Sequence, residues 1–236
     1  MQFLSRIPFV AAIVLLLLAG QAGFAQQEID PIRWEPAMQA FDEQDRASPP
    51  PEGAIVLTGS SSIARWNDQA ASALAPLTVI ARGFGGSTMQ EALYHLDRVA
   101  LRYKPRAILI YEGDNDTWGR IPEDEIVDNF KQIVAKVHEE LPETRVYVMS
   151  VKPSVARVDV WPAAQKVNGQ LKAVAETDPL VHYVDAVTPF MKADGTVMTD
   201  IFIDDDLHFN TLGNLIWGST IRAALMPLEA RHEILR

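Results

Sequence analysis

Three serines stand in a row in the stretch LTGSSSIARW, residues 57–66, directly after an apolar run. A serine hydroxyl becomes a nucleophile when a histidine takes its proton, a carboxylate orients that histidine and N–H donors stabilise the oxyanion. The stretch IDDDLHFN near the chain end offers the other two groups, because Asp205 precedes His208 by three residues. In a turn, that spacing brings both side chains to one face. The candidate chemistry is acyl transfer, with Ser61 as nucleophile, His208 as base and Asp205 as the orienting carboxylate.

Oxyanion donors are available from two further stretches and from the serine itself. The backbone N–H of Ser61 would lie at a helix N-terminus. Gly86, in RGFGGST, lacks a Cβ and so allows its N–H to approach a substrate closely. Asn115, in EGDNDTW, offers an uncharged side-chain amide. The sequence therefore predicts an oxyanion hole built from Ser61, Gly86 and Asn115.

These residues follow short apolar runs that alternate with longer amphipathic ones. The runs predict five strands, at 54–59, 77–84, 106–113, 145–153 and 181–186. Helical spacing predicts four helices, at 87–101, 122–141, 160–175 and 211–226. Near-continuous apolar strands, each followed by a helix, indicate a parallel sheet covered on both faces, an α/β fold in the form of a three-layer α/β/α sandwich. In a flavodoxin-like strand order of 2-1-3-4-5, the first three carboxyl ends are neighbours, so Ser61, Gly86 and Asn115 would converge.

Four stretches, LTGSSSIARW, RGFGGST, EGDNDTW and IDDDLHFN, occur in this order along the chain. In this order they resemble the motifs of the SGNH, or GDSL, esterase and lipase family, and the resemblance spans about residues 54–226. Register with the family selects Ser61 as the nucleophile and leaves Ser60 or Ser62 as a helix N-cap. The resemblance implies a flavodoxin-like fold, an acyl-serine intermediate, small ester substrates, and neither a metal nor another cofactor. One position departs from the family pattern: Ser60 replaces the aspartate of Gly-Asp-Ser, which affects the local hydrogen bonding around the nucleophile.

The chain divides into three segments. Residues 1–25 combine a short basic start, about a dozen apolar residues and small residues at Gly23 and Ala25, which predicts a cleaved signal peptide. Residues 26–53, rich in Gln, Asp, Glu and Pro, predict an arm that lies along the domain or stays mobile. Residues 54–236 form the predicted hydrolase domain. We expect a bacterial protein exported to the periplasm or the medium, without disulfides because the chain has no cysteine.

The charge balance limits the partners. The 236 residues carry a formal net charge of −10, and no cluster of Lys and Arg interrupts the acidic balance. Nucleic acid is therefore excluded as an expected partner, since its affinity comes largely from neutralised phosphates. We also expect no stable membrane insertion after signal removal. The expected partner is a small-molecule ester or an acylated glycan.

Other interpretations remain at this stage. Asp204–Asp206 with His208, joined by Asp114 and Asp116, could be imagined as ligands of a hard metal, although no EF-hand or zinc spacing is present. The RGFGGST stretch could bind phosphate, but it lacks the spacing and lysine of a P-loop. An α/β-hydrolase elbow would need glycine where Ile63 stands.

Two further alternatives concern binding. A non-catalytic carbohydrate-binding protein on the same fold would not need every catalytic position to be filled, as it is here. Arg65, Trp66, Trp118 and Trp161 follow strand ends, where they could line a pocket or belong to the core.

Overall fold

The computed structural model describes residues 29–233, so the predicted signal peptide at 1–25 lies outside the described residues. Its centre is a sheet of five parallel strands in the order β2-β1-β3-β4-β5. The strands are β1 (Ile55–Gly59), β2 (Val79–Gly83), β3 (Ala107–Tyr111), β4 (Arg145–Met149) and β5 (Val181–Val184). The predicted fold class and strand order are confirmed.

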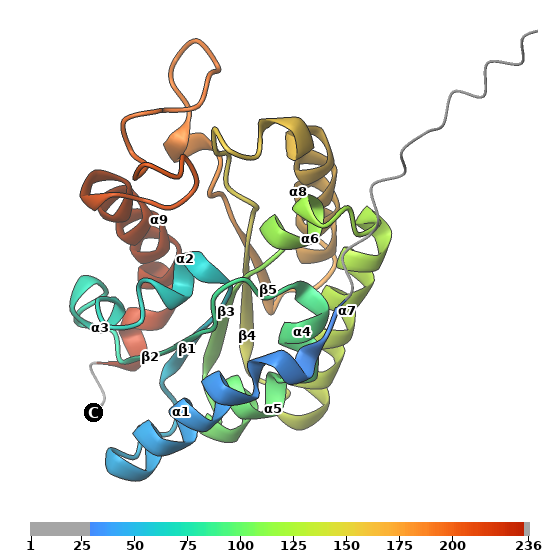
Figure 1. Cartoon of the computed structure of the whole chain (residues 1–236). Helices are drawn as coiled ribbons and strands as arrows, with labels where there is room; N and C mark the ends of the chain where they lie inside the picture. The colour runs from blue at the N-terminus through green and yellow to red at the C-terminus, as the bar shows by residue number, and fades with distance from the viewer. Residues whose placement is uncertain (1–28, 234–236) are drawn as a thin grey trace, which may run out of the picture.

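Helices cover both faces of this sheet (Figure 1). They are α1 (Glu35–Ala47), α2 (Ser61–Ala64), α3 (Ala70–Ala73), α4 (Met89–Tyr94), α5 (Leu96–Val99), α6 (Asp114–Trp118), α7 (Glu123–Glu140), α8 (Trp161–Ala175) and α9 (Thr211–Glu229). In α7 the acidic residues of the first turn complement the helix dipole, and Ile126, Phe130, Ile133 and Val137 form one buried face.

Successive strand residues point to opposite faces, and this alternation divides the core in two. Val56 and Ile108 pack on one side with α1, α4, α5, α7 and α8. Leu57 and Leu109 pack on the other side with α2, α3 and α9. The sheet therefore has an apolar layer on each face, and its carboxyl-end edge is where the loops carrying polar residues meet.

Two predicted elements differ from the structure. The helix expected over 87–101 is interrupted at His95, whose Nε2 atom hydrogen-bonds to the Pro31 carbonyl oxygen (2.7 Å), so α4 and α5 are separate. The strand expected over 145–153 ends at Met149, and residues 150–153 continue without regular structure toward the carboxyl-end edge.

The segment expected to be an arm contains a helix that belongs to the fold. A 3-10 turn at Pro31–Trp34 leads into α1, which buries Met38 and Phe41 against the sheet. The composition of this segment suggested a loop because charged and amide side chains occupy the other faces of α1. No helix between residues 29 and 233 is long and apolar enough to cross a membrane.

Candidate active site

A chain of hydrogen bonds joins Ser61, His208 and Asp205 at the carboxyl-end edge of the sheet. The Ser61 Oγ atom lies 2.8 Å from His208 Nε2, and His208 Nδ1 lies 2.6 Å from Asp205 Oδ2. A carboxylate can only accept, so Nδ1 carries the proton and Nε2 is free to accept from the serine hydroxyl. The structure thus brings together the three residues that the sequence proposed, in an arrangement suited to proton transfer from serine to histidine.

The position of Ser61 follows from the end of β1. Gly59 has a φ of 134°, and a Cβ at this residue would collide with the carbonyl oxygen of Tyr111 on the neighbouring strand. The chain can therefore turn there only because residue 59 is glycine. Ser61 is the first residue of α2, so its backbone N–H has no acceptor within the helix.

The other two serines are buried beside it. Ser60 is the N-cap residue of α2, but its side chain makes no capping bond, and its Oγ atom has no hydrogen-bond partner among the described residues. Ser62 is 8% exposed. Of the three serines, Ser61 is the one whose hydroxyl meets His208.

Asp205 is held as a carboxylate by its own turn. Its Oδ1 atom accepts the N–H groups of Leu207 (3.0 Å) and His208 (2.8 Å). Desolvation acts to raise the pKa of Asp205, but these hydrogen bonds and the imidazole outweigh it and lower that pKa to about 2. Asp205 therefore remains ionised at any pH at which His208 could act as a base.

Gly86 and Asn115 lie in the same cleft. Gly86 has a φ of 86°, in the left-handed region that glycine adopts readily. The Asn115 Nδ2 atom donates one N–H to the Ser87 carbonyl oxygen (2.9 Å), which leaves its second N–H for another acceptor. The cleft has a volume of about 500 Å³ and is lined by Ser61, Ala64, Arg65, Gly85, Gly86, Asn115, Arg157, Leu207 and His208.

Arg33, which the sequence analysis did not single out, holds the turn at Gly86 in place through a hydrogen bond. Its guanidinium donates to the Gly86 carbonyl oxygen (3.0 Å) and to both carboxylate oxygens of Glu91 (2.7 and 2.8 Å). Glu91 in turn caps α4 at Thr88. The N-terminal segment thereby ties down the loop that carries Gly86, which only the tertiary structure reveals.

Two buried carboxyl groups lie under the same loop. Glu112 accepts the Ser87 hydroxyl (2.5 Å), and Asp116 accepts the N–H groups of Met89 (2.9 Å) and Gly113 (3.0 Å). Desolvation raises the pKa of Asp116 to about 7, against the opposing effect of its backbone donors. Desolvation, with the charge of Asp116, also raises the pKa of Glu112 well above its usual range.

These raised pKa values predict a pH-dependent stability. The folded state holds a proton on Glu112 that the unfolded chain releases above about pH 4.5, so this contribution is present below that pH and is lost as pH rises. The Glu112→Gln variant, which cannot ionise, should therefore gain unfolding free energy relative to the native chain as the pH rises from 5 to 8. Urea denaturation at both pH values measures this, and an unchanged difference between the two proteins would contradict it.

Lys152 and Arg157 are two further charged residues that the sequence analysis did not single out. The Lys152 side chain is fully buried, and its Nζ atom donates to the Leu207 carbonyl oxygen (2.8 Å), next to His208. The Arg157 Nη2 atom donates to Asn115 Oδ1 (3.3 Å), which leaves Nδ2 as the donor side of that amide. Burial lowers the pKa of both cations. Arg157 follows the strand predicted over 145–153, where the carboxyl-end rule directs attention, whereas Lys152 fell inside that predicted strand, which ends at Met149 in the structure.

The four residues that could line a pocket or belong to the core, Arg65, Trp66, Trp118 and Trp161, lie in different environments. Arg65 lines the cleft. Trp66 is 1% exposed and packs in the core near α9, so of the two alternatives it is a core residue. Trp118 is half exposed and stacks on Arg157, with the guanidinium carbon 4.5 Å from the ring centroid. Neither Trp118 nor Trp161 is among the residues that line the cleft.

The carboxylates considered as metal ligands do not converge. Asp114 lies 3.7 Å from Lys152 Nζ and accepts the Tyr111 hydroxyl (3.2 Å), while Asp116 faces the backbone under the Gly86 loop. Within residues 29–233, no group of three His, Cys, Asp or Glu side chains is placed to hold a metal ion.

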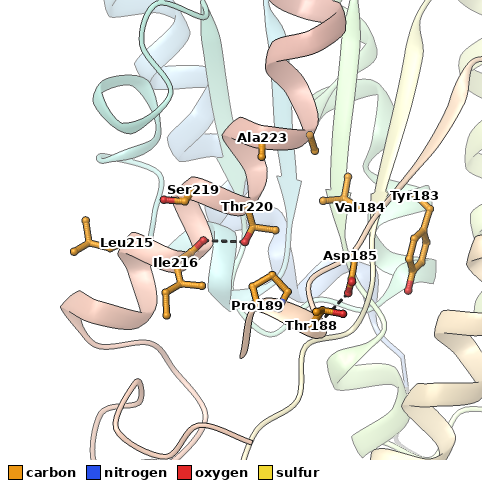
Figure 2. Close-up of a pocket in the computed structure, with 11 residues that line it drawn as sticks. Tyr183, Val184, Asp185, Thr188, Pro189, Leu215, Ile216, Ser219, Thr220 and Ala223 are labelled. Carbon is orange, nitrogen blue, oxygen red and sulfur yellow. Dashed lines mark hydrogen bonds between the residues drawn. The ribbon is translucent and has the colours of Figure 1, made fainter. Parts of the chain in front are cut away.

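A larger cavity, of about 660 Å³, lies away from this chemistry between β5, the 3-10 turn Thr188–Phe190 and α9 (Figure 2). Its lining is mainly apolar and contains no histidine. Two of its polar side chains are engaged locally: the Thr220 hydroxyl donates to the Ile216 carbonyl oxygen (2.9 Å), and Asp185 accepts the Thr188 N–H (3.0 Å). The candidate chemistry therefore belongs to the smaller cleft.

Known proteins share this sequence pattern and this fold. Residues 48–216 match the model of the GDSL-like lipase/acylhydrolase family. The platelet-activating factor acetylhydrolase IB subunit alpha1 of Pongo abelii is 30% identical over 161 residues, which cover 67% of this chain and 68% of that protein.

Solved structures of two bacterial hydrolases are similar in fold. A GDSL-like lipase from Bacteroides thetaiotaomicron has a TM-score of 0.68 and 19% identity, and the match covers 80% of this chain and 97% of that one. A catalytic mutant of an acetylxylan esterase from Geobacillus stearothermophilus has a TM-score of 0.61 and 14% identity, over 75% and 95% of the two chains. From the match to the family model and the 30% identical relative, it follows that this chain belongs to the GDSL-like lipase/acylhydrolase family, whose members hydrolyse ester bonds.

Proposed function

We propose that this hydrolase is a serine esterase that acts through an acyl-serine intermediate. Ser61 Oγ attacks the ester carbonyl carbon while His208 takes the hydroxyl proton and Asp205 stabilises the imidazolium. The tetrahedral intermediate then collapses, His208 returns the proton to the departing alcohol, and the acyl group stays on Ser61. Water, activated by the same histidine, attacks the acyl-serine and releases the carboxylic acid and the free serine.

The observation that carries this proposal is the continuous hydrogen-bond chain from Ser61 through His208 to Asp205, at 2.8 and 2.6 Å. The backbone N–H groups of Ser61 and Gly86 and the free N–H of Asn115 border the same cleft and would stabilise the oxyanion. This arrangement also favours an enzyme over a carbohydrate-binding protein, because binding alone needs no serine–histidine contact.

For the substrate, we propose an ester with a short acyl group, including acetyl groups on carbohydrates. Two similar proteins carry an acetyl hydrolase activity in their names, the platelet-activating factor acetylhydrolase subunit and the acetylxylan esterase. Leu207 and Ala64 give the cleft two apolar walls beside Ser61 and His208, which suits a small acyl group.

Covalent labelling tests the assignment of the nucleophile. A fluorophosphonate should react with the native protein, and peptide mapping should place the adduct on Ser61. An adduct on Ser60 or Ser62, or the absence of any adduct on a folded protein that hydrolyses esters, would contradict the proposed mechanism.

The Asn115→Ala variant tests the proposed oxyanion hole. Loss of one oxyanion donor typically lowers the rate about 10²–10³-fold, and we expect that loss in kcat for a short-chain aryl ester. Gln170→Ala is the matched control, because it removes an amide that binds Asp124 on the far helices and should keep the native rate. A native rate for folded Asn115→Ala would show that this amide does not stabilise the transition state.

We also propose that residues 1–25 direct export and are removed. Their charged start, apolar stretch and small residues support this proposal. Mass spectrometry of the protein produced in a bacterial host measures the mature N-terminus, and an intact start at Met1 in all cell fractions would argue against cleavage.

A further inference from the structure

Two arginines line the cleft on either side of the reacting groups. Arg65 follows Ser61 by one helical turn, with its N–H donating to the Ser61 carbonyl oxygen (2.9 Å), and Arg157 comes from the loop after β4. No Asp or Glu is among the residues that line this cleft. This local excess of positive charge stands in a chain whose formal net charge is −10.

Arg65 is a cation available to solvent. Its side chain is exposed, and it forms no ion pair or hydrogen bond with any side chain in the described part of the chain. Exposed Arg102, by contrast, is paired with Asp42. The Arg65 guanidinium can therefore bind a ligand without first breaking a contact within the protein.

Arg157 is buried but incompletely neutralised. Asp114 is its nearest carboxylate, 4.0 Å from Nε, and the same carboxylate lies 3.7 Å from the Nζ atom of buried Lys152. The Asp114 carboxylate is thus shared between two cations, and Asp205 also acts on Lys152 but is not among the charges that act on Arg157. The Arg157 Nη1 atom also has no hydrogen-bond acceptor among residues 29–233. Positive charge therefore remains on the cleft wall beside Asn115.

Other arginines of similar burial show how this protein pairs a structural guanidinium. Arg145, with 13% of its side chain exposed, contacts Glu229 at 2.6 Å, and Arg82, with 10% exposed, contacts Asp45 directly. Arg157 also has 13% of its side chain exposed, yet its carboxylate lies 4.0 Å away. A buried arginine left without a close counter-ion is costly unless a ligand supplies the missing charge.

We propose that the ester substrate carries an anionic group, a carboxylate, phosphate or sulfate, which Arg65 and Arg157 bind beside the scissile bond. This inference rests on the proposed esterase function and specifies the substrate class of that site. A planar guanidinium can donate two parallel N–H bonds to such a group, which gives direction as well as attraction. Trp118, stacked on Arg157, keeps that guanidinium at the rim of the cleft.

Matched pairs of chromogenic esters test the proposal. The first pair, para-nitrophenyl pentanoate and para-nitrophenyl glutarate, has acyl chains of equal length, and only the second bears a carboxylate. The second pair, para-nitrophenyl acetate and its analogue with a carboxylate on the ring, places the charge on the alcohol side. We expect the anionic member of one pair to have a kcat/KM about tenfold higher, and the pair that shows it identifies the side of the substrate that carries the charge.

Variants then assign the preference to the arginines. Arg65→Gln should lower the anionic-to-neutral ratio of kcat/KM about fivefold, and Arg65→Glu should lower it further. Arg157→Gln should lower the anionic-to-neutral ratio about tenfold. The effect is larger than for Arg65 because an anionic group bound to the buried Arg157 would be less exposed to water. A purely structural role for either arginine would reduce both esters of a pair equally and leave the ratio unchanged.

Arg46→Gln is the charge-matched control, since it removes an exposed arginine of α1 that is not among the residues that line the cleft, and it should keep the native ratio. Rising salt should also reduce the ratio in the native enzyme, because the Debye length shortens to about 8 Å at 0.15 M. If the neutral esters are hydrolysed but no pair shows a preference that depends on the arginines, the anionic substrate is ruled out and the esterase proposal stands. If no ester of either pair is hydrolysed, both proposals fail.

Discussion

The Ser61→Ala variant is expected to lose kcat by about 10⁴–10⁶-fold on a short-chain aryl ester, because no other hydroxyl in the structure meets His208. The alanine removes the atom that would form the proposed acyl-enzyme, while the oxyanion donors and the cleft remain. KM should therefore change little compared with kcat. Steady-state assays with highly purified protein measure both values.

The fold should tolerate this change. The Ser61 side chain is partly exposed and its recorded side-chain partner is His208, so thermal melting of the variant should match that of the native protein. Ser72→Ala removes an exposed hydroxyl from α3, where it binds only the Gln69 carbonyl oxygen, and should keep full activity. Substantial turnover by Ser61→Ala would move the nucleophile to another residue.

The His208→Ala variant is expected to lose kcat to a similar extent, since the serine hydroxyl then has no base. The residues act as a unit, so the double variant Ser61→Ala with His208→Ala should be hardly slower than either single variant. Asp205 would remain hydrogen-bonded to the Leu207 N–H, so the turn should keep its shape. Measurements of kcat for the two single variants and the double variant test whether the losses are additive.

His138→Ala provides the comparison for this second prediction. His138 binds the Thr144 carbonyl oxygen at the end of α7, outside the cleft, and its loss should leave kcat unchanged. Additive losses in the double variant would mean that His208 assists by a route that does not pass through Ser61.

Much of the fold could be predicted from sequence because its signals are local. Strands buried on both faces require near-continuous apolar runs, and these occur at β1, β3 and β4, while the edge strands β2 and β5 are shorter apolar runs that are partly buried. Helix α7 shows an acidic first turn and regular apolar spacing, and it begins and ends within one residue of the prediction. Helix α1 was missed because its short apolar face, Met38 and Phe41, is masked by charged neighbours.

For the candidate site, the sequence alone predicted that Ser61, Gly86, Asn115, Asp205 and His208 come together. Asp205 and His208 are three residues apart, and Ser61, Gly86 and Asn115 each follow a strand of a parallel sheet, so local spacing and strand order suffice to bring them together.

Only the tertiary structure decided the surroundings of these groups. Arg33 reaches Gly86 across 53 residues of chain, and Lys152 reaches Leu207 across 55. Trp66 and Trp118 both follow strand ends, but Trp66 is buried in the core and Trp118 is exposed on the surface. Burial, the partners of a charge and the resulting pKa depend on which distant segments pack together, and no pattern confined to neighbouring residues carries that information.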